Sequence, residues 1–144
     1  QMIFYPHYEV QRNLKYLQSL SNRIVLASKD DYDVQKLLKE SQLLITDFSS
    51  VFFDFAYMGK PLIYYQFDRE FFFRNHYKKG YFDYDEHGFG PVCTTEDEVI
   101  ERIEKYFQNH FEVEEVYRER VQKFFPLRDN NNCKRIYEAI INLN

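Results

Sequence analysis

The chain has 144 residues, 44% hydrophobic and 29% charged, which is the composition of one globular domain, residues 1–144, and not of a disordered segment. Its formal net charge of −4, without a long basic run, argues against nucleic acid as a partner. Its apolar runs are far shorter than the roughly 20 residues that cross a bilayer, and Cys93 and Cys133 lack metal-ligand spacing and are expected to be reduced structural thiols.

Short apolar runs of strand length alternate with helix-like segments, which predicts an α/β fold, a Rossmann-like parallel sheet with flanking helices. Four strands, apolar enough to be buried on both faces, are expected at residues 2–5, 23–27, 43–46 and 61–65, with a short edge strand near Val92. Helices are expected at residues 9–20, 31–40, 50–58, 95–107, 113–125 and 132–141. Residues 67–87 show no clear pattern, and a short helix and a loop are expected there.

Polar residues follow each of the four main strands. In an open parallel sheet the ligand crevice lies beyond the carboxyl ends of the strands, so these residues are the first candidates for a site. They are Pro6 and His7, Ser28 and Lys29, the run from Asp47 to Ser50, and Gln66 with Asp68.

The run Thr46-Asp47-Phe48-Ser49-Ser50 passes directly from a buried strand into a helix. The start of such a helix can hold a phosphate through backbone N–H groups and serine hydroxyls, without a glycine-rich loop. The alternative is that Asp47 or Ser49 is only an N-cap. Because its carboxylate would repel a diphosphate, Asp47 is expected to hold the turn through backbone hydrogen bonds.

His7 is a candidate for charge stabilisation or proton exchange near a phosphate, although a lone histidine also fits an exposed loop residue. Neither the dinucleotide fingerprint, nor a Walker-type loop, nor a nucleophile elbow is present. The acids and histidine between residues 83 and 87 suggest a solvated loop more than a metal site.

Residues 44–56, LITDFSSVFFDFA, and residues 60–65, KPLIYY, strongly resemble the CDP-glycerol glycerophosphotransferases of teichoic acid synthesis. Pro6-His7-Tyr8 is similar to the family's histidine motif, although Tyr5 stands where a basic residue is common. Downstream, the run from Lys79 to Asp83, the Gly90-Pro91 turn, and Asp129 with Arg135 resemble further family motifs. The departures there are Lys79 for Arg, Phe89 for Pro, Asn130 for Gly and Lys134 for Glu.

The resemblance implies that this chain is the C-terminal, donor-binding half of a GT-B fold. The acceptor-side domain, with a second histidine as general base, would lie upstream, so the chain alone is expected to be inactive. The expected reaction is transfer of glycerol phosphate from CDP-glycerol to a teichoic-acid-type acceptor with release of CMP.

The same resemblance implies roles for individual residues. His7 is the expected catalytic residue, and no cofactor or protein-bound metal is expected. The expected donor-binding residues are Thr46, Asp47, Ser49, Ser50, Asp83, Gly90, Pro91 and Arg135.

The expected partners are CDP-glycerol and, through the missing domain, a polyprenyl-linked glycerol phosphate primer, without nucleic acid. The full-length protein would then be cytoplasmic and peripheral on the inner face of the cell membrane. Two alternatives stay open: a related glycosyl- or ribitol-phosphate transferase domain, and a nucleotide-binding module without catalysis.

Overall fold

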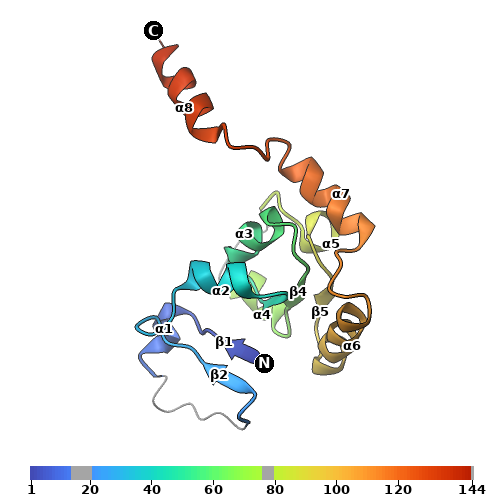
Figure 1. Ribbon diagram of the computed structural model, residues 1–144. Coiled ribbons are helices and arrows are strands. Elements are labelled where there is room, and N and C mark those ends of the chain that lie inside the picture. The colour runs from blue at the N-terminus through green and yellow to red at the C-terminus, as the bar shows by residue number, and fades with distance from the viewer. Residues whose placement is uncertain (14–20, 76–79, 144) are drawn as a thin grey trace. The chain divides into compact units, whose positions relative to one another are not determined.

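A computed structural model describes residues 1–13, 21–75 and 80–143, which divide into two compact units, Gln1–Ser41 and Gln42–Asn144 (Figure 1). Both units contain parallel strands with helices between them, which confirms the predicted α/β class. Most of the helix predicted over residues 9–20 lies outside the described residues, and so does Lys79.

The first unit pairs β1 (Met2–Phe4) with β2 (Ile24–Leu26) in parallel, and its helices are α1 (Tyr8–Gln11) and α2 (Val34–Glu40). Helix α2 begins later than the predicted residue 31. The reason is that the Ser28 hydroxyl donates to the Asp31 carboxylate at 2.6 Å and holds that segment in a turn. The Asp33 carboxylate then accepts the Lys36 N–H at 2.9 Å and caps the helix.

The second unit contains a parallel sheet with the strand order β3-β4-β5. Its strands are β3 (Leu44–Thr46), β4 (Leu62–Tyr65) and β5 (Val92–Cys93), so the predicted edge strand lies at one end of this sheet. The helices are α3 (Val51–Tyr57), α4 (Arg69–Asn75), α5 (Tyr84–His87), α6 (Glu96–Gln108), α7 (Glu115–Phe124) and α8 (Asn132–Ile141). None of the helices in the described ranges combines the length and apolar character that a membrane span requires.

The start of helix α6 was predicted well because its capping residues lie close together in the sequence. Thr95 and Glu98 form a capping box, in which the threonine hydroxyl accepts the Glu98 N–H and the Glu98 carboxylate accepts the Thr95 N–H. These bonds satisfy N–H groups that the first turn of a helix leaves without partners.

The core of the second unit surrounds β4. On one face, the fully buried Tyr64 ring contacts Phe52 of α3 and Tyr84 of α5, with ring centroids 5.1 and 4.9 Å apart. On the other face, Ile63 packs with Cys93 and with two residues of α6. The many aromatic residues of the chain therefore serve largely as packing groups.

Burial on both faces was predicted for all four strands, and this is wrong for most of them. Only β4 is largely buried, β2 and β3 are half-buried, and β1 is exposed on all three residues. In the first unit the described helices are short, and α2 buries none of its residues, so they give β1 little cover. The cysteine prediction holds for Cys93, which is free and buried, but Cys133 is free and exposed.

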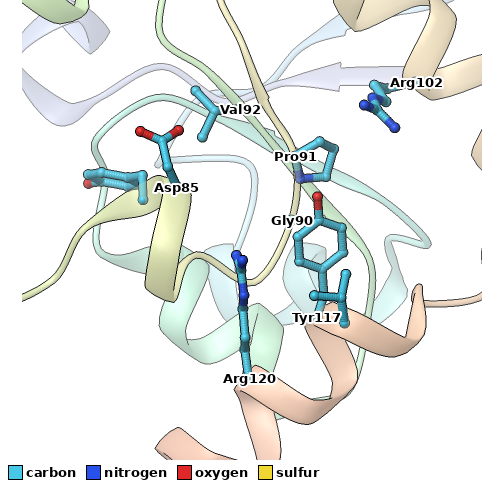
Figure 2. A pocket seen from close by; sticks show the side chains of 9 residues that line it. Asp85, Gly90, Pro91, Val92, Arg102, Tyr117 and Arg120 are labelled. Atoms are coloured by element: carbon cyan, nitrogen blue, oxygen red, sulfur yellow. The ribbon is translucent and has the colours of Figure 1, made fainter.

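The turn before β5 is packed against β4. Gly90 and Pro91 are buried there, directly before Val92 (Figure 2). A Cβ at position 90 would collide with the Leu62 carbonyl, so this close approach requires glycine.

Replacing Tyr64 by Phe should lower the free energy of unfolding by about 1–3 kcal/mol, because the buried Phe89 N–H donates to the Tyr64 hydroxyl at 3.2 Å and would lose its acceptor. Chemical denaturation measures this change. Tyr81→Phe is the matched control, because Tyr81 is 83% exposed. Equal effects of the two changes would contradict a stabilising role for the Tyr64 hydroxyl.

Candidate functional site

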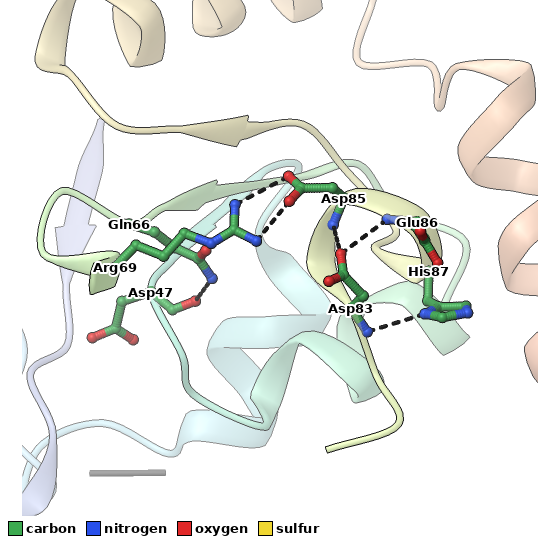
Figure 3. A network of polar contacts seen from close by, with 7 residues as sticks. All are labelled: Asp47, Gln66, Arg69, Asp83, Asp85, Glu86 and His87. Atoms are coloured by element: carbon green, nitrogen blue, oxygen red, sulfur yellow. Dashed lines mark hydrogen bonds and ion pairs between the residues drawn. The ribbon is translucent and has the colours of Figure 1, made fainter. Parts of the chain in front are cut away.

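The carboxyl ends of β3 and β4 lie side by side in the second unit, with Thr46 opposite Tyr64. Gln66 follows β4, is fully buried, and donates through its side-chain amide to the Asp47 carbonyl at 3.4 Å (Figure 3). Its backbone N–H donates to the Cys93 carbonyl at 2.8 Å. Gln66 therefore ties the turn after β3 to the centre of the sheet.

The turn of residues 47–50 has the conformation that the sequence predicted. The Ser49 N–H donates to the Asp47 carboxylate at 3.2 Å, so Asp47 holds the turn. Ser50 directly precedes α3 but makes no side-chain cap bond. Within the described ranges, the hydroxyls of Ser49 and Ser50 have no hydrogen-bond partner, which leaves both available to a ligand.

Two residues that the sequence analysis did not predict, Arg69 and Tyr84, lie beside this turn. Arg69 opens α4 and makes a bidentate ion pair with Asp85 of α5, with N–O distances of 2.6 and 3.1 Å (Figure 3). Burial raises the pKa of the Tyr84 hydroxyl, the Asp47 carboxylate raises it further, and Arg69 opposes this. The one sequence signal for Arg69 was its position shortly after the fourth strand.

Asp83 is the N-cap of α5. Its carboxylate accepts the N–H groups of Asp85 and Glu86 at 2.9 and 3.3 Å, and its own N–H donates to His87 Nδ1 at 3.0 Å (Figure 3). These side chains therefore organise a helix start. In the described part of the chain, no three His, Cys, Asp or Glu side chains are grouped as a metal site would require.

Gly90 and Pro91 lie elsewhere on the sheet from the turn of residues 47–50. They precede β5, at the amino ends of the parallel strands, whereas Asp47 follows β3 at the carboxyl ends. Both line an open cavity of about 220 Å³, here called the β5 groove, whose lining includes Asp85, Pro91, Val92, Arg102, Tyr117 and Arg120 (Figure 2). Their predicted contact with the donor stays a prediction.

Arg135 is engaged within its own segment. Its guanidinium makes two hydrogen bonds to the Asp129 carboxylate, at 2.8 and 3.1 Å, and a third to the Asn132 side chain. This pairing, with a bond from the Asn131 N–H, holds the pKa of Asp129 far below its usual value. A phosphate contact by Arg135 would have to share these bonds, and it too stays a prediction.

In the first unit, the carboxyl ends of β1 and β2 are joined by Gln11. Its side-chain amide donates to the Pro6 carbonyl at 2.9 Å and accepts the Lys29 N–H at 3.1 Å. His7 lies at this edge, is exposed, and accepts the Glu9 N–H through Nδ1 at 3.4 Å as the N-cap of α1. The sequence placed His7 and Lys29 at strand ends but did not predict the bridging glutamine.

Comparison with known proteins decides the family. The model of the CDP-Glycerol:Poly(glycerophosphate) glycerophosphotransferase family matches residues 1–142. The chain belongs to this family. The resemblance predicted from residues 44–65 is thereby confirmed.

Individual relatives cover nearly all of the chain. It is 38% identical, over 97% of its length, to the minor teichoic acid biosynthesis protein GgaB of Bacillus subtilis strain 168. It is 30% identical, also over 97%, to a teichoic acid poly(glycerol phosphate) polymerase of Bacillus spizizenii. The chain spans 15% of the first relative and 34% of the second.

The fold resembles that of the wall teichoic acid polymerase TagF. The TM-score is 0.68 at 23% identity, and the match covers 96% of this chain and 33% of TagF. The likeness confirms the predicted fold, a Rossmann-like α/β fold of the kind found in the GT-B protein TagF.

Replacing Asp47 by Ala should speed hydrogen exchange of the Ser49 amide about tenfold, because a net hydrogen bond of about 1–1.5 kcal/mol is lost from the turn. Exchange measured by NMR tests this. Asp47→Asn is the control, because its amide oxygen can still accept the bond. Unchanged exchange in Asp47→Ala would show that this carboxylate does not hold the turn.

Proposed function

We propose that the protein containing this chain transfers glycerol phosphate from CDP-glycerol to a teichoic-acid-type acceptor and releases CMP, and that this chain supplies the donor site. The family match over residues 1–142 supports the reaction class. The observation that carries the donor-site assignment is the turn of residues 47–50, in which a carboxylate fixes the backbone and two neighbouring serine hydroxyls are not used as caps.

In this proposal the hydroxyls of Ser49 and Ser50 donate to the diphosphate of CDP-glycerol. Asp47 stays bound to the Ser49 N–H and keeps the turn in one conformation before the donor arrives. Gln66 supports the same turn from inside the sheet through the Asp47 carbonyl. Such preorganisation lowers the cost of binding, since few groups need to be ordered when the ligand enters.

The proposed step is an in-line displacement at phosphorus. The acceptor's terminal hydroxyl oxygen attacks the glycerol-bearing phosphorus, and the bond from that phosphorus to the bridging oxygen breaks. CMP leaves with that oxygen, and the hydroxyl proton passes to a base proposed to lie in the domain upstream. Because phosphoryl transfer depends mostly on positioning and charge stabilisation, His7 is proposed to stabilise charge on the phosphoryl or leaving oxygen.

The remaining roles are part of the same proposal. Asp83, Gly90 and Pro91 flank the ribose or the base, Thr46 contributes to the donor edge, and Arg135 reaches the phosphate if it exchanges its Asp129 partner. The acceptor is a polyprenyl-linked glycerol phosphate primer. The whole protein acts at the inner face of the cell membrane as a peripheral protein.

Two other functions make different predictions. A ribitol-phosphate or glycosyl transferase would bind its own nucleotide-activated donor more tightly than CDP-glycerol. A nucleotide-binding module without catalysis would bind CDP-glycerol but release no CMP when the full-length protein is given donor and primer. Competition binding and a CMP-release assay separate the three.

The double change Ser49→Ala and Ser50→Ala should weaken CDP-glycerol binding strongly while the melting temperature changes little. Each charge-assisted hydrogen bond to a phosphate is worth about 1.5–3 kcal/mol, and neither hydroxyl makes a cap bond that folding would lose. Calorimetric titration and thermal unfolding of the same variant measure the two effects. A collapse of the melting temperature with unchanged affinity would show that these serines serve folding instead.

His7→Ala in the full-length protein should slow glycerol phosphate transfer by about 10²–10⁴-fold, as expected for a positioned acid, base or charge-stabilising group. Affinity for CDP-glycerol should fall much less, because the serines are proposed to hold the diphosphate. His7→Gln, which keeps a hydrogen-bond donor but carries no proton, distinguishes hydrogen bonding from proton transfer. Near-normal rates in His7→Ala would remove this residue from the mechanism.

A further inference from the structure

The β5 groove contains backbone groups that the sheet leaves unused. The Tyr64 N–H donates to the Pro91 carbonyl at 2.9 Å, and the Gln66 N–H donates to the Cys93 carbonyl at 2.8 Å. The carbonyls of residues 91 and 93 therefore face β4. Since successive residues of a strand direct their backbone groups to alternate sides, the N–H and C=O of Val92 face the open edge. Within the described ranges neither group has a partner.

Two guanidinium groups lie along the same groove. Arg120 of α7 donates to the Gly88 carbonyl at 2.9 Å and lies over the Tyr117 ring, with its guanidinium carbon 5.6 Å from the ring centroid (Figure 2). Arg102 of α6 makes only a long ion pair, in which its Nη1 lies 3.9 Å from Oε1 of Glu114. Arg120 forms no ion pair with any carboxylate of the described residues.

The charges around the groove favour an anion. Asp85 is neutralised by the bidentate pair with Arg69. The Glu114 carboxylate lies 2.8 Å from Lys105 Nζ, closer than its 3.9 Å distance from Arg102 Nη1. The lining residues and their ion-pair partners carry three positive and two negative charges, although the whole chain has a net charge of −4. The cations are Arg69, Arg102 and Arg120, the anions are Asp85 and Glu114, and Lys105 also pairs with Glu114.

Tyr117 adds a neutral donor between the two arginines. Burial raises the pKa of its hydroxyl, the Glu114 carboxylate raises it further, and Arg102 and Arg120 oppose that rise. The hydroxyl therefore keeps its proton at neutral pH. The cavity of about 220 Å³ is smaller than the roughly 300–1,000 Å³ of drug-sized pockets, so it suits a small polar group.

We propose that the β5 groove binds a phosphate ester that carries a free hydroxyl, such as one glycerol phosphate unit. The phosphate accepts from Arg102, Arg120, Tyr117 and the Val92 N–H, and the ligand hydroxyl donates to the Val92 carbonyl. The site does not include the turn of residues 47–50 and does not rest on that assignment, although its lining includes Gly90 and Pro91, which are also proposed to flank the ribose or the base of CDP-glycerol. The ester comes either from a soluble monomer or from a unit of a glycerol phosphate polymer, and its chemistry is the same in both.

Calorimetric titration of the chain with inorganic phosphate, glycerol 3-phosphate and a glycerol phosphate oligomer tests this proposal. Glycerol 3-phosphate should bind more tightly than inorganic phosphate, because only the ester can donate to Val92. Equal affinities would overturn the hydroxyl contact. An oligomer that binds more tightly than the monomer supports the polymer as the source, and equal binding of the two supports the soluble ester.

Variants locate the site. Arg102→Gln should weaken glycerol 3-phosphate binding about tenfold or more, as the loss of one charge-assisted hydrogen bond does. Arg120→Gln should weaken binding to the same extent. If that variant unfolds because Arg120 no longer donates to the Gly88 carbonyl, the Arg102→Gln variant still tests the site. Lys123→Gln is the matched control: it removes one positive charge from an exposed position of α7.

The proposal also predicts which amide responds. In NMR titrations the Val92 amide should shift with glycerol 3-phosphate, and Lys123→Gln should leave both shift and affinity unchanged. A shift of the Ser49 amide without one at Val92 would overturn the proposal, and so would a loss in Lys123→Gln as large as in Arg102→Gln. Failure of CDP-glycerol to bind would instead count against the donor site alone.

Discussion

The second unit depends on the position of β4, which is paired on both edges and packed on both faces. Pairing with β3 and β5 fixes where the turn after β3 and the turn before β5 can lie. Packing of Tyr64 on one face and Ile63 on the other fixes α3, α5 and α6 against it. Both candidate ligand sites of this unit therefore inherit their geometry from four residues of one strand.

A glutamine side chain joins two strand ends in each sheet. Gln11 links the Pro6 carbonyl to the Lys29 N–H in the first unit, and Gln66 links the Asp47 turn to β4 in the second. The Gln11 amide uses both a donor and an acceptor without a charge that would need compensation, whereas Gln66 uses only its donor, and its buried Oε1 accepts no hydrogen bond from the described residues. In each sheet the glutamine helps to fix a loop that carries a candidate functional residue, His7 in one and Ser49 in the other.

The charged residues divide into those that build the structure and those that remain for a ligand. Arg69 and Arg135 each make bidentate pairs with carboxylates, which fix local structure and reduce their availability to a phosphate. Arg120 is held by a carbonyl and a tyrosine ring, neither of which neutralises its charge. Counting cations in the sequence cannot make this distinction, because it depends on which carboxylate each guanidinium reaches.

The sequence by itself determined the α/β class, nearly all strands and helices outside residues 67–87, the family and the turn at Asp47. These follow from local patterns: apolar periodicity, the capping box of α6, and an aspartate that can accept a nearby backbone N–H. Only the tertiary structure decided that β1 is exposed, that Gln66 supports the Asp47 turn, that Arg69 pairs with Asp85, and that Val92 opens onto a groove with Arg102 and Arg120. Each of these depends on which residues distant in the chain become neighbours, and the spacing of residues along a single chain does not specify such contacts.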